Sequence, residues 1–161
     1  MVAEELDGVR HVTECLFSAL SSRNAVAAAA CYDERAVFSS PIIGEVRGAD
    51  IESLWHAIFA ATRDNALSYA VVDLGLTSAR VEGVTTYSLV SSGRSVTSRF
   101  NSLLHVRDHR VCRHDDTLDP WAWARMAFGP TGFVFGWSRA WQRHISQDLC
   151  TSFDTDPPDG S

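Results

Sequence analysis

The chain has 161 residues, with 14 basic and 20 acidic side chains and a net charge of −6. This length suits one domain, and a composition of 45% hydrophobic and 21% charged residues provides for one core and argues against general disorder. Every basic residue is arginine, which excludes Schiff-base chemistry, a lysine-anchored pyridoxal phosphate and a lysine-bearing phosphate loop. The arginines are scattered singly in an acidic chain, so the sequence also offers no electrostatic footprint for nucleic acid.

The cysteines show no C-x-x-C spacing, and the longest apolar runs are too short to cross a membrane. We find no pattern typical of a signal peptide. We therefore expect reduced thiols that act as small buried hydrophobes, and a cytoplasmic protein.

The first third of the chain shows the spacing of helices. Apolar side chains recur at three- and four-residue intervals, acidic residues lie in the first turn, and Asn24 is placed to cap a short alanine-rich helix. The spacing predicts helices over residues 4–21, 25–31 and 48–62, and a short strand over residues 36–39.

The pattern then changes to that of strands joined by short turns. We predict β segments over residues 67–76, 80–90, 95–107 and 110–119, and short connections imply antiparallel neighbours. Helical spacing returns after Pro120, breaks at 129–132 and resumes at Phe133. The sequence thus predicts one α+β domain over residues 1–150, with N-terminal helices on the concave face of a curved antiparallel sheet, a helical extension over 120–150 and a disordered tail over 151–161.

Three phrases carry a family resemblance: YDERAVF at residues 32–38, GEVRG at 44–48 and VRDHRVCRHDD at 106–116. Together with the order of elements, they resemble the nuclear transport factor 2-like superfamily and, within it, the SnoaL-like branch, over roughly residues 5–128. The resemblance implies a cone-shaped and usually dimeric fold. Relatives of this kind include polyketide cyclases, ketosteroid isomerases and limonene-type epoxide hydrolases, so the fold alone does not select a function.

The residues of the family's known sites are mostly replaced here. The tyrosine, the base aspartate and the proton-donating aspartate of ketosteroid isomerases correspond to Leu16, Ser40 and Ser102. The arginine–aspartate pair of limonene-type epoxide hydrolases is missing around residues 82–87. The acidic residue on the last strand, which the hydrolases and the polyketide cyclases use, corresponds to Asp116.

On that last strand, Cys112, His114 and Asp116 share one face because side chains alternate, and the resemblance places this face inside the cone. His114 and Asp116 lie about 6.6 Å apart along the strand, close enough to bind one ligand or each other. We predict that Asp116, poorly solvated in an oily cavity, removes or delivers a proton and that His114 orients it. One alternative is a buried pair in which His114 and Asp116 only hydrogen-bond each other and have no role in catalysis. The other is that this strand face is turned to solvent.

The same alternation and the resemblance place further side chains around the cavity. A funnel of aromatic rings and hydroxyls suits a largely apolar, oxygen-bearing small molecule, with Tyr87 or Tyr32 donating to its oxygen. The alternative for each tyrosine is a core residue with a satisfied hydroxyl. The predicted substrate-binding residues are Tyr32, Ser40, Trp55, Thr85, Tyr87, Ser98, Phe100 and Ser102.

We expect no metal site, because successive same-face residues of one strand rarely converge on an ion and His105 and His109 point elsewhere. The opposite sheet face suits a second copy of the chain, and the resemblance implies a homodimer there. That face presents Thr97, Arg99, Asn101, Leu103 and His105.

The aromatic residues after Pro120 are too many to leave in water, and we expect them to cover the mouth of the cone or a dimer partner. A membrane-surface helix is the alternative, which the negative charge disfavours.

From the residues and the resemblance we expect a small-molecule enzyme with cofactor-free acid/base chemistry, such as isomerisation, cyclisation or epoxide opening. The alternatives are a non-catalytic ligand-binding or dimerisation module of the same fold, and a structural partner protein that docks through its aromatic C-terminal segment.

Overall fold

The computed structural model describes residues 1–129, so the predicted helical segment from Phe133 and the predicted disordered tail lie outside the described residues. Within residues 1–129, no helix is both long and apolar enough to cross a membrane. The elements are, in chain order, α1 (Val2–Ser21), α2 (Ala25–Ala30), β1 (Tyr32–Ser40), β2 (Gly44–Arg47), α3 (Asp50–Ala61), β3 (Thr62–Leu74), β4 (Ser78–Leu89), β5 (Ser95–Arg107), β6 (Arg110–Thr117) and α4 (Pro120–Phe128).

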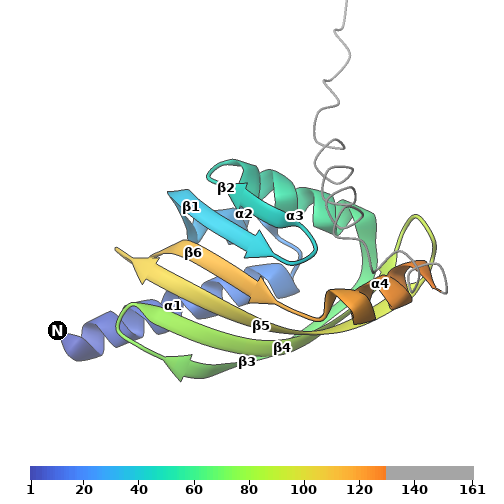
Figure 1. Ribbon diagram of the computed structural model, residues 1–161. Coiled ribbons are helices and arrows are strands. Elements are labelled where there is room, and N and C mark those ends of the chain that lie inside the picture. Colours follow the sequence, from blue (N-terminus) through green and yellow to red (C-terminus); the bar gives the residue numbers. More distant parts are fainter. Residues whose placement is uncertain (130–161) are drawn as a thin grey trace, which may run out of the picture.

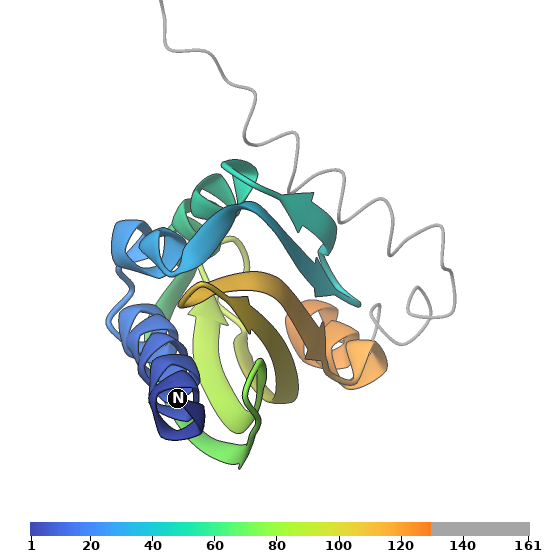
Figure 2. The ribbon, with the colours of Figure 1, turned by 90° about the vertical axis from the view of Figure 1, so that its left-hand side faces the viewer.

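The strands form one curved sheet in the order β2-β1-β6-β5-β4-β3. Helices α1, α2 and α3 lie on one side of the curved sheet, and α4 lies beyond the end of β6 (Figures 1 and 2). The predicted α+β fold is confirmed. Neighbouring strands are antiparallel as predicted, except that β1 and β6 are parallel. No short turn joins these two strands, so the hairpin rule does not constrain their direction.

The core forms where the apolar stripe of α1 meets α3 and the inner face of the sheet. In α1, Val9, Val12 and Leu16 are almost completely buried, as the helical spacing predicts. They belong to one continuous core with Phe38 of β1 and Leu104 of β5. The helices therefore close one side of the sheet and leave room between their inner faces and the strands.

Several strands extend further than the sequence predicts, and β2 was not predicted. Strand β1 begins at Tyr32 instead of residue 36, and β3 begins at Thr62 instead of residue 67. The added residues are largely polar and solvent-exposed, as are most of β2. Strands of this kind carry no run of apolar residues, so periodicity does not reveal them.

Strand β6 contains a β-bulge at Cys112. On β5, His105 and Val106 are consecutive, but their partners on β6 are Arg113 and Val111, so Cys112 is the extra residue. Val111 and His114 consequently both face the interior, although three positions separate them. The alternation predicted Cys112 on the inner face, and this prediction is wrong: its Sγ donates to the carbonyl of His105, 3.3 Å away.

Arginine side chains bind carbonyl groups at the C-terminal ends of helices. Arg23 donates to the carbonyls of Phe59 and Thr62 where α3 ends. Arg94 does the same for Met126 in α4, at 2.8 Å, and Arg110 for Ala30 in α2, at 3.1 Å. A cation at this end of a helix is favoured by the helix dipole and satisfies orphan carbonyls.

Gly83 of β4 lies directly under the ring of its cross-strand partner Phe100. A Cβ atom at position 83 would lie 2.5 Å from Cζ of Phe100 and 2.6 Å from the carbonyl oxygen of Ser68. Both distances are far below van der Waals contact, so only glycine lets the Phe100 ring lie flat on β4.

We predict that Gly83→Ala lowers the free energy of unfolding by about 1–3 kcal/mol, because the ring or the β4 backbone must move. Urea denaturation followed by circular dichroism measures this change. Gly75→Ala is the matched control, since its Cβ would approach chiefly the movable hydroxyl of Ser78, at 3.0 Å. Equal stability losses in the two variants would contradict the prediction.

Candidate functional site

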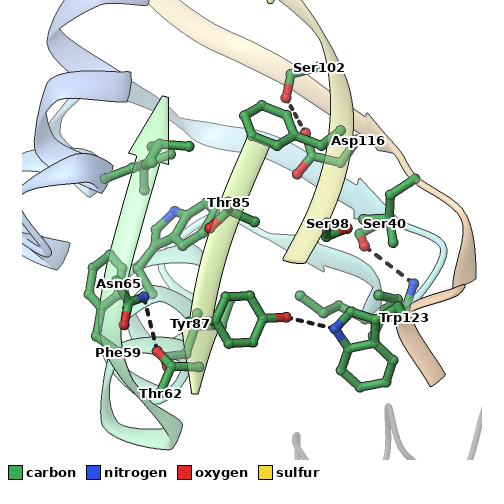
Figure 3. A pocket seen from close by; sticks show the side chains of 18 of the residues that line it. Ser40, Phe59, Thr62, Asn65, Thr85, Tyr87, Ser98, Ser102, Asp116 and Trp123 are labelled. Carbon is green, nitrogen blue, oxygen red and sulfur yellow. Dashed lines mark hydrogen bonds between the residues drawn. The ribbon is translucent and has the colours of Figure 1, made fainter. Parts of the chain in front are cut away.

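A cavity of about 230 Å³ lies between the helices and the inner face of the sheet. It falls below the 300–1,000 Å³ range of sites for drug-sized molecules, so it suits a compact ligand. Its lining is mostly apolar, with a few hydroxyls and one carboxylate (Figure 3). The lining residues are Phe17, Leu20, Ser21, Phe38, Ser40, Ile42, Ile43, Trp55, Ile58, Phe59, Ala61, Thr62, Asn65, Leu67, Thr85, Tyr87, Leu89, Ser98, Phe100, Ser102, His114, Asp116, Leu118 and Trp123.

His114 lies at the inner end of this cavity and is only 1% exposed. The edge of the Phe38 ring packs against its imidazole at a centroid distance of 4.9 Å, and Tyr32 stacks on it at 6.0 Å. Phe17 and Trp55 complete the surroundings at 6.3 and 6.5 Å. The imidazole is therefore held in one orientation by aromatic packing.

Both ring nitrogens of His114 have hydrogen-bond partners. Nε2 lies 2.7 Å from Oδ1 of Asp116, and Nδ1 lies 2.7 Å from the hydroxyl of Tyr32. An ionised carboxylate only accepts, so the network assigns the proton to Nε2 and makes Nδ1 the acceptor of the Tyr32 hydroxyl. The result is a directed chain in which Tyr32 donates to His114 and His114 donates to Asp116.

Asp116 receives a second hydrogen bond from Ser102, its cross-strand partner on β5. Ser102 and His114 both donate to the same oxygen, Oδ1. Within residues 1–129, Oδ2 has no hydrogen-bond partner, and the side chain is 18% exposed at the cavity. One carboxylate oxygen is thus fixed by the protein and the other remains available to a ligand.

Tyr32 lies behind His114 and is not among the residues that line the cavity. Burial, and to a lesser degree the charge of Asp116, raise the pKa of Tyr32 well above 10, so its hydroxyl remains a donor. The Trp55 indole opposes this rise in the pKa, yet its buried N–H forms no hydrogen bond of acceptable geometry with residues 1–129.

Tyr87 lies at the other end of the cavity, where its hydroxyl oxygen accepts a 2.6 Å hydrogen bond from Nε1 of Trp123 (Figure 3). Burial raises the pKa of Tyr87, and the bond from Trp123 opposes the rise. Since the oxygen accepts from Trp123, the Tyr87 proton is left for another acceptor. Helix α4 thus reaches the cavity through one indole.

The two polar ends of the cavity are well separated. Tyr87 pairs with Val96 on β5, whereas Asp116 pairs with Ser102 on the same strand. Six residues of extended strand separate these partners, which corresponds to about 20 Å. Tyr87 and Asp116 therefore cannot engage the same atom of a compact ligand.

The structure brings nearly all of the predicted site residues to one cavity. Every predicted catalytic or substrate-binding residue lines it except Tyr32, which reaches it through His114. Sequence reasoning missed the polar groups of Thr62 and Asn65, which come from the start of β3; the spacing places Thr62 at the end of a helix and Asn65 in no element. Trp123 belongs to the aromatic run expected to cover the mouth.

The residues considered as metal ligands do not gather. Within residues 1–129, no group of three or more His, Cys, Asp or Glu side chains is placed to hold an ion. His109 packs against Gly8 of α1, and the thiol of Cys112 binds the backbone.

We predict that Tyr32→Phe lowers the free energy of unfolding by about 1–3 kcal/mol at neutral pH, because Nδ1 of His114 loses its donor. The raised pKa of Tyr32 stabilises the fold fully below pH 10, the ordinary tyrosine pKa, and this contribution falls as the pH rises toward the folded value. The stability difference between wild type and variant should therefore shrink above pH 10 in urea denaturation. A constant difference from pH 7 to 11 would contradict this account.

Solved structures with a similar fold share little sequence with this chain. A candidate polyketide cyclase from a Silicibacter species superposes with a TM-score of 0.68 at 13% identity, over 75% of this chain and 96% of that one. A Catenulispora acidiphila protein of ketosteroid isomerase-like fold, in complex with trimethylamine, gives 0.66 at 13% identity over 79% and 96%. TerC, co-crystallised with polyporic acid, gives 0.65 at 14% identity over 74% and 98%. At these identities the likeness shows the fold alone.

No curated protein sequence is significantly similar to this chain. A protein-family model does match: the SnoaL-like domain model covers residues 13–114, which extend from α1 to His114. This match confirms the resemblance carried by the sequence phrases. The chain belongs to the SnoaL-like domain family and has a nuclear transport factor 2-like fold.

Proposed function

We propose that this protein is an enzyme that moves a proton on a compact, mostly apolar and oxygen-bearing ligand, without a cofactor, and that Asp116 is the acid/base. In isomerisation or cyclisation, Oδ2 of Asp116 takes a proton from a carbon of the ligand, and the proton returns to another atom. In epoxide opening, Oδ2 takes the proton of the water that attacks the ring carbon, and the alkoxide released by C–O cleavage is protonated. These three reactions are the ones that the family resemblance implies.

One observation carries the proposal: both hydrogen bonds to Asp116 fall on Oδ1, which leaves Oδ2 facing an oily cavity. The donors hold the carboxylate in place without competing for the second oxygen. A base of this kind needs no reorganisation when the ligand arrives. His114 and Tyr32 act behind it as positioning residues.

The rest of the lining supports the choice of ligand. Aromatic and aliphatic side chains supply most of the surface, and the hydroxyls of Thr85, Ser98 and Tyr87 are spread along β4 and β5. A ligand with an apolar body and more than one oxygen fits this distribution. Two solved structures of similar fold were obtained with small molecules, trimethylamine in one protein and polyporic acid in the other, which supports a small-molecule ligand here.

We also propose that two copies associate through the outer face of β4 and β5, where Arg99, Leu103 and His105 are exposed. A cytoplasmic location remains a prediction from the cysteines.

We predict that the wild-type protein exchanges the α-protons of β-tetralone, a bicyclic ketone, for deuterium in heavy water, and that Asp116→Asn slows this exchange by roughly 10²–10⁴-fold. Proton NMR follows the loss of the α-proton signal. Asp115→Asn is the matched control, because this carboxylate pairs with Arg113 outside the cavity and should leave the rate unchanged.

A protein that binds β-tetralone, seen as a change in tryptophan fluorescence, but leaves its α-protons in place would favour the non-catalytic binding module instead. Full exchange activity in Asp116→Asn would show that another group is the base.

A further inference from the structure

Ser40 of β1 lies beside Asp116 on the neighbouring strand. The parallel register pairs Phe38 with His114 and Ser39 with Asp115, so the next step along both strands brings Ser40 level with Asp116. Adjacent strands are about 4.8 Å apart, and both residues line the cavity. Figure 3 shows Ser40 and Asp116 on the same wall. A ligand atom next to Oδ2 of Asp116 is therefore within reach of the Ser40 hydroxyl.

The Ser40 hydroxyl is buried and has a spare proton. Ser40 is only 6% exposed. Its oxygen accepts a 3.3 Å hydrogen bond from the backbone N–H of Ile42, which fixes the oxygen but uses no proton of the hydroxyl. Among the groups of residues 1–129, none accepts that proton. A buried donor without an acceptor at a cavity wall is the group that a ligand oxygen would satisfy.

The other hydrogen-bond donors of the cavity are occupied, lie behind His114, or are distant. Ser98 and its partner Thr85 lie four residues along β5 from Ser102, about 13 Å away. Ser102 donates to Oδ1 of Asp116. The Trp55 N–H lies against Tyr32, behind His114. Tyr87 lies at the opposite end of the cavity, next to Trp123. Among these donors, the Ser40 hydroxyl is the one on the strand next to Asp116, beside Oδ2.

We propose that Ser40 is a catalytic hydrogen-bond donor to the ligand's carbonyl oxygen, and that the substrate is a carbonyl compound with an acidic C–H next to that carbonyl. This inference rests on the proposed role of Asp116. Oδ2 takes the proton, the C–H electron pair forms a carbon–carbon double bond, and the carbonyl π electrons move onto the oxygen as an enolate. The Ser40 hydroxyl stabilises this charge, and return of the proton to carbon regenerates the carboxylate.

The substrate class follows from the direction of the two groups. Asp116 presents an acceptor and Ser40 a donor, side by side on adjacent strands. A carbonyl carbon with an adjacent C–H presents the complementary order, with the oxygen to Ser40 and the hydrogen to Asp116. An alcohol oxygen also accepts from Ser40, but its neighbouring C–H is not acidic, and a protonated amine offers no acceptor at all.

Two reactions separate the donor from the base. Exchange of β-tetralone α-protons needs both, because the enolate oxygen carries the charge. Ring opening of nitrobenzisoxazole needs mainly the base: removal of the ring C–H breaks the N–O bond, and the nitro-substituted phenolate product holds the charge itself.

We predict that Ser40→Ala slows the exchange by roughly 10²-fold and changes the ring opening by less than about threefold. Ser40→Thr, which keeps the hydroxyl, should retain most of the exchange activity. Should the added methyl prevent folding, Ser40→Cys, whose thiol is a weaker donor, should fall between wild type and Ser40→Ala. Ser39→Ala on the opposite face of β1 is the matched control, with both rates unchanged.

The outcomes distinguish the two proposals. Unchanged exchange in Ser40→Ala, with exchange lost in Asp116→Asn, would overturn the role of Ser40 and leave that of Asp116. Equal losses of both reactions in Ser40→Ala would show that Ser40 only supports Asp116 or the fold, which also overturns the donor role. Both reactions intact in Asp116→Asn, or absent in the wild type, would overturn the proposed function itself and this inference with it.

Discussion

A buried imidazole needs a partner at each ring nitrogen, and this requirement ties the sheet together around His114. An unpaired buried nitrogen costs about 1–3 kcal/mol, a large share of the stability of a domain this size. The partners come from different places: Tyr32 opens β1, while Asp116 lies two residues further along β6 and is itself held by Ser102 of β5. Three strands must therefore keep their registers together. The hydrogen bond from Tyr32 to His114 also fixes the parallel pairing of β1 with β6, which no hairpin enforces.

The interior stays partly open because its aromatic rings pack against one another instead of filling it. Phe17 stacks on Phe100 at 6.0 Å, and Trp55 on Phe59 at 6.2 Å. The flat placement of Phe100 depends on the missing side chain at Gly83. Rings held in pairs keep rigid walls around a small volume, so polar groups at either end of the cavity retain fixed directions. Preorganised donors and acceptors in a poorly solvated space are what acid/base chemistry requires.

Local patterns predicted much of this arrangement. Helical spacing located α1 and α3, and strand alternation with the family resemblance placed His114 and Asp116 inside. The missing parts depend on contacts that are distant in sequence. The hydrogen bond between Tyr32 and His114 spans 82 residues, so a buried tyrosine could be predicted but not that it serves an imidazole instead of a ligand. The parallel strand pair, the start of β3 at Thr62 and the arginines that cap helix ends likewise follow from tertiary packing, which periodicity does not record.

The bulge residue Cys112 in β6 affects how the side chains of relatives of this chain are oriented. Because Cys112 interrupts the two-residue period, Val111 fills the core and His114 still reaches the cavity. A relative with one residue fewer at this point would have to turn either its core side chain or the residues that correspond to His114 and Asp116 toward water. Gain or loss of a single codon there could therefore switch chemistry on or off while the cone survives, which offers a simple route by which one architecture yields both enzymes and inert binding proteins.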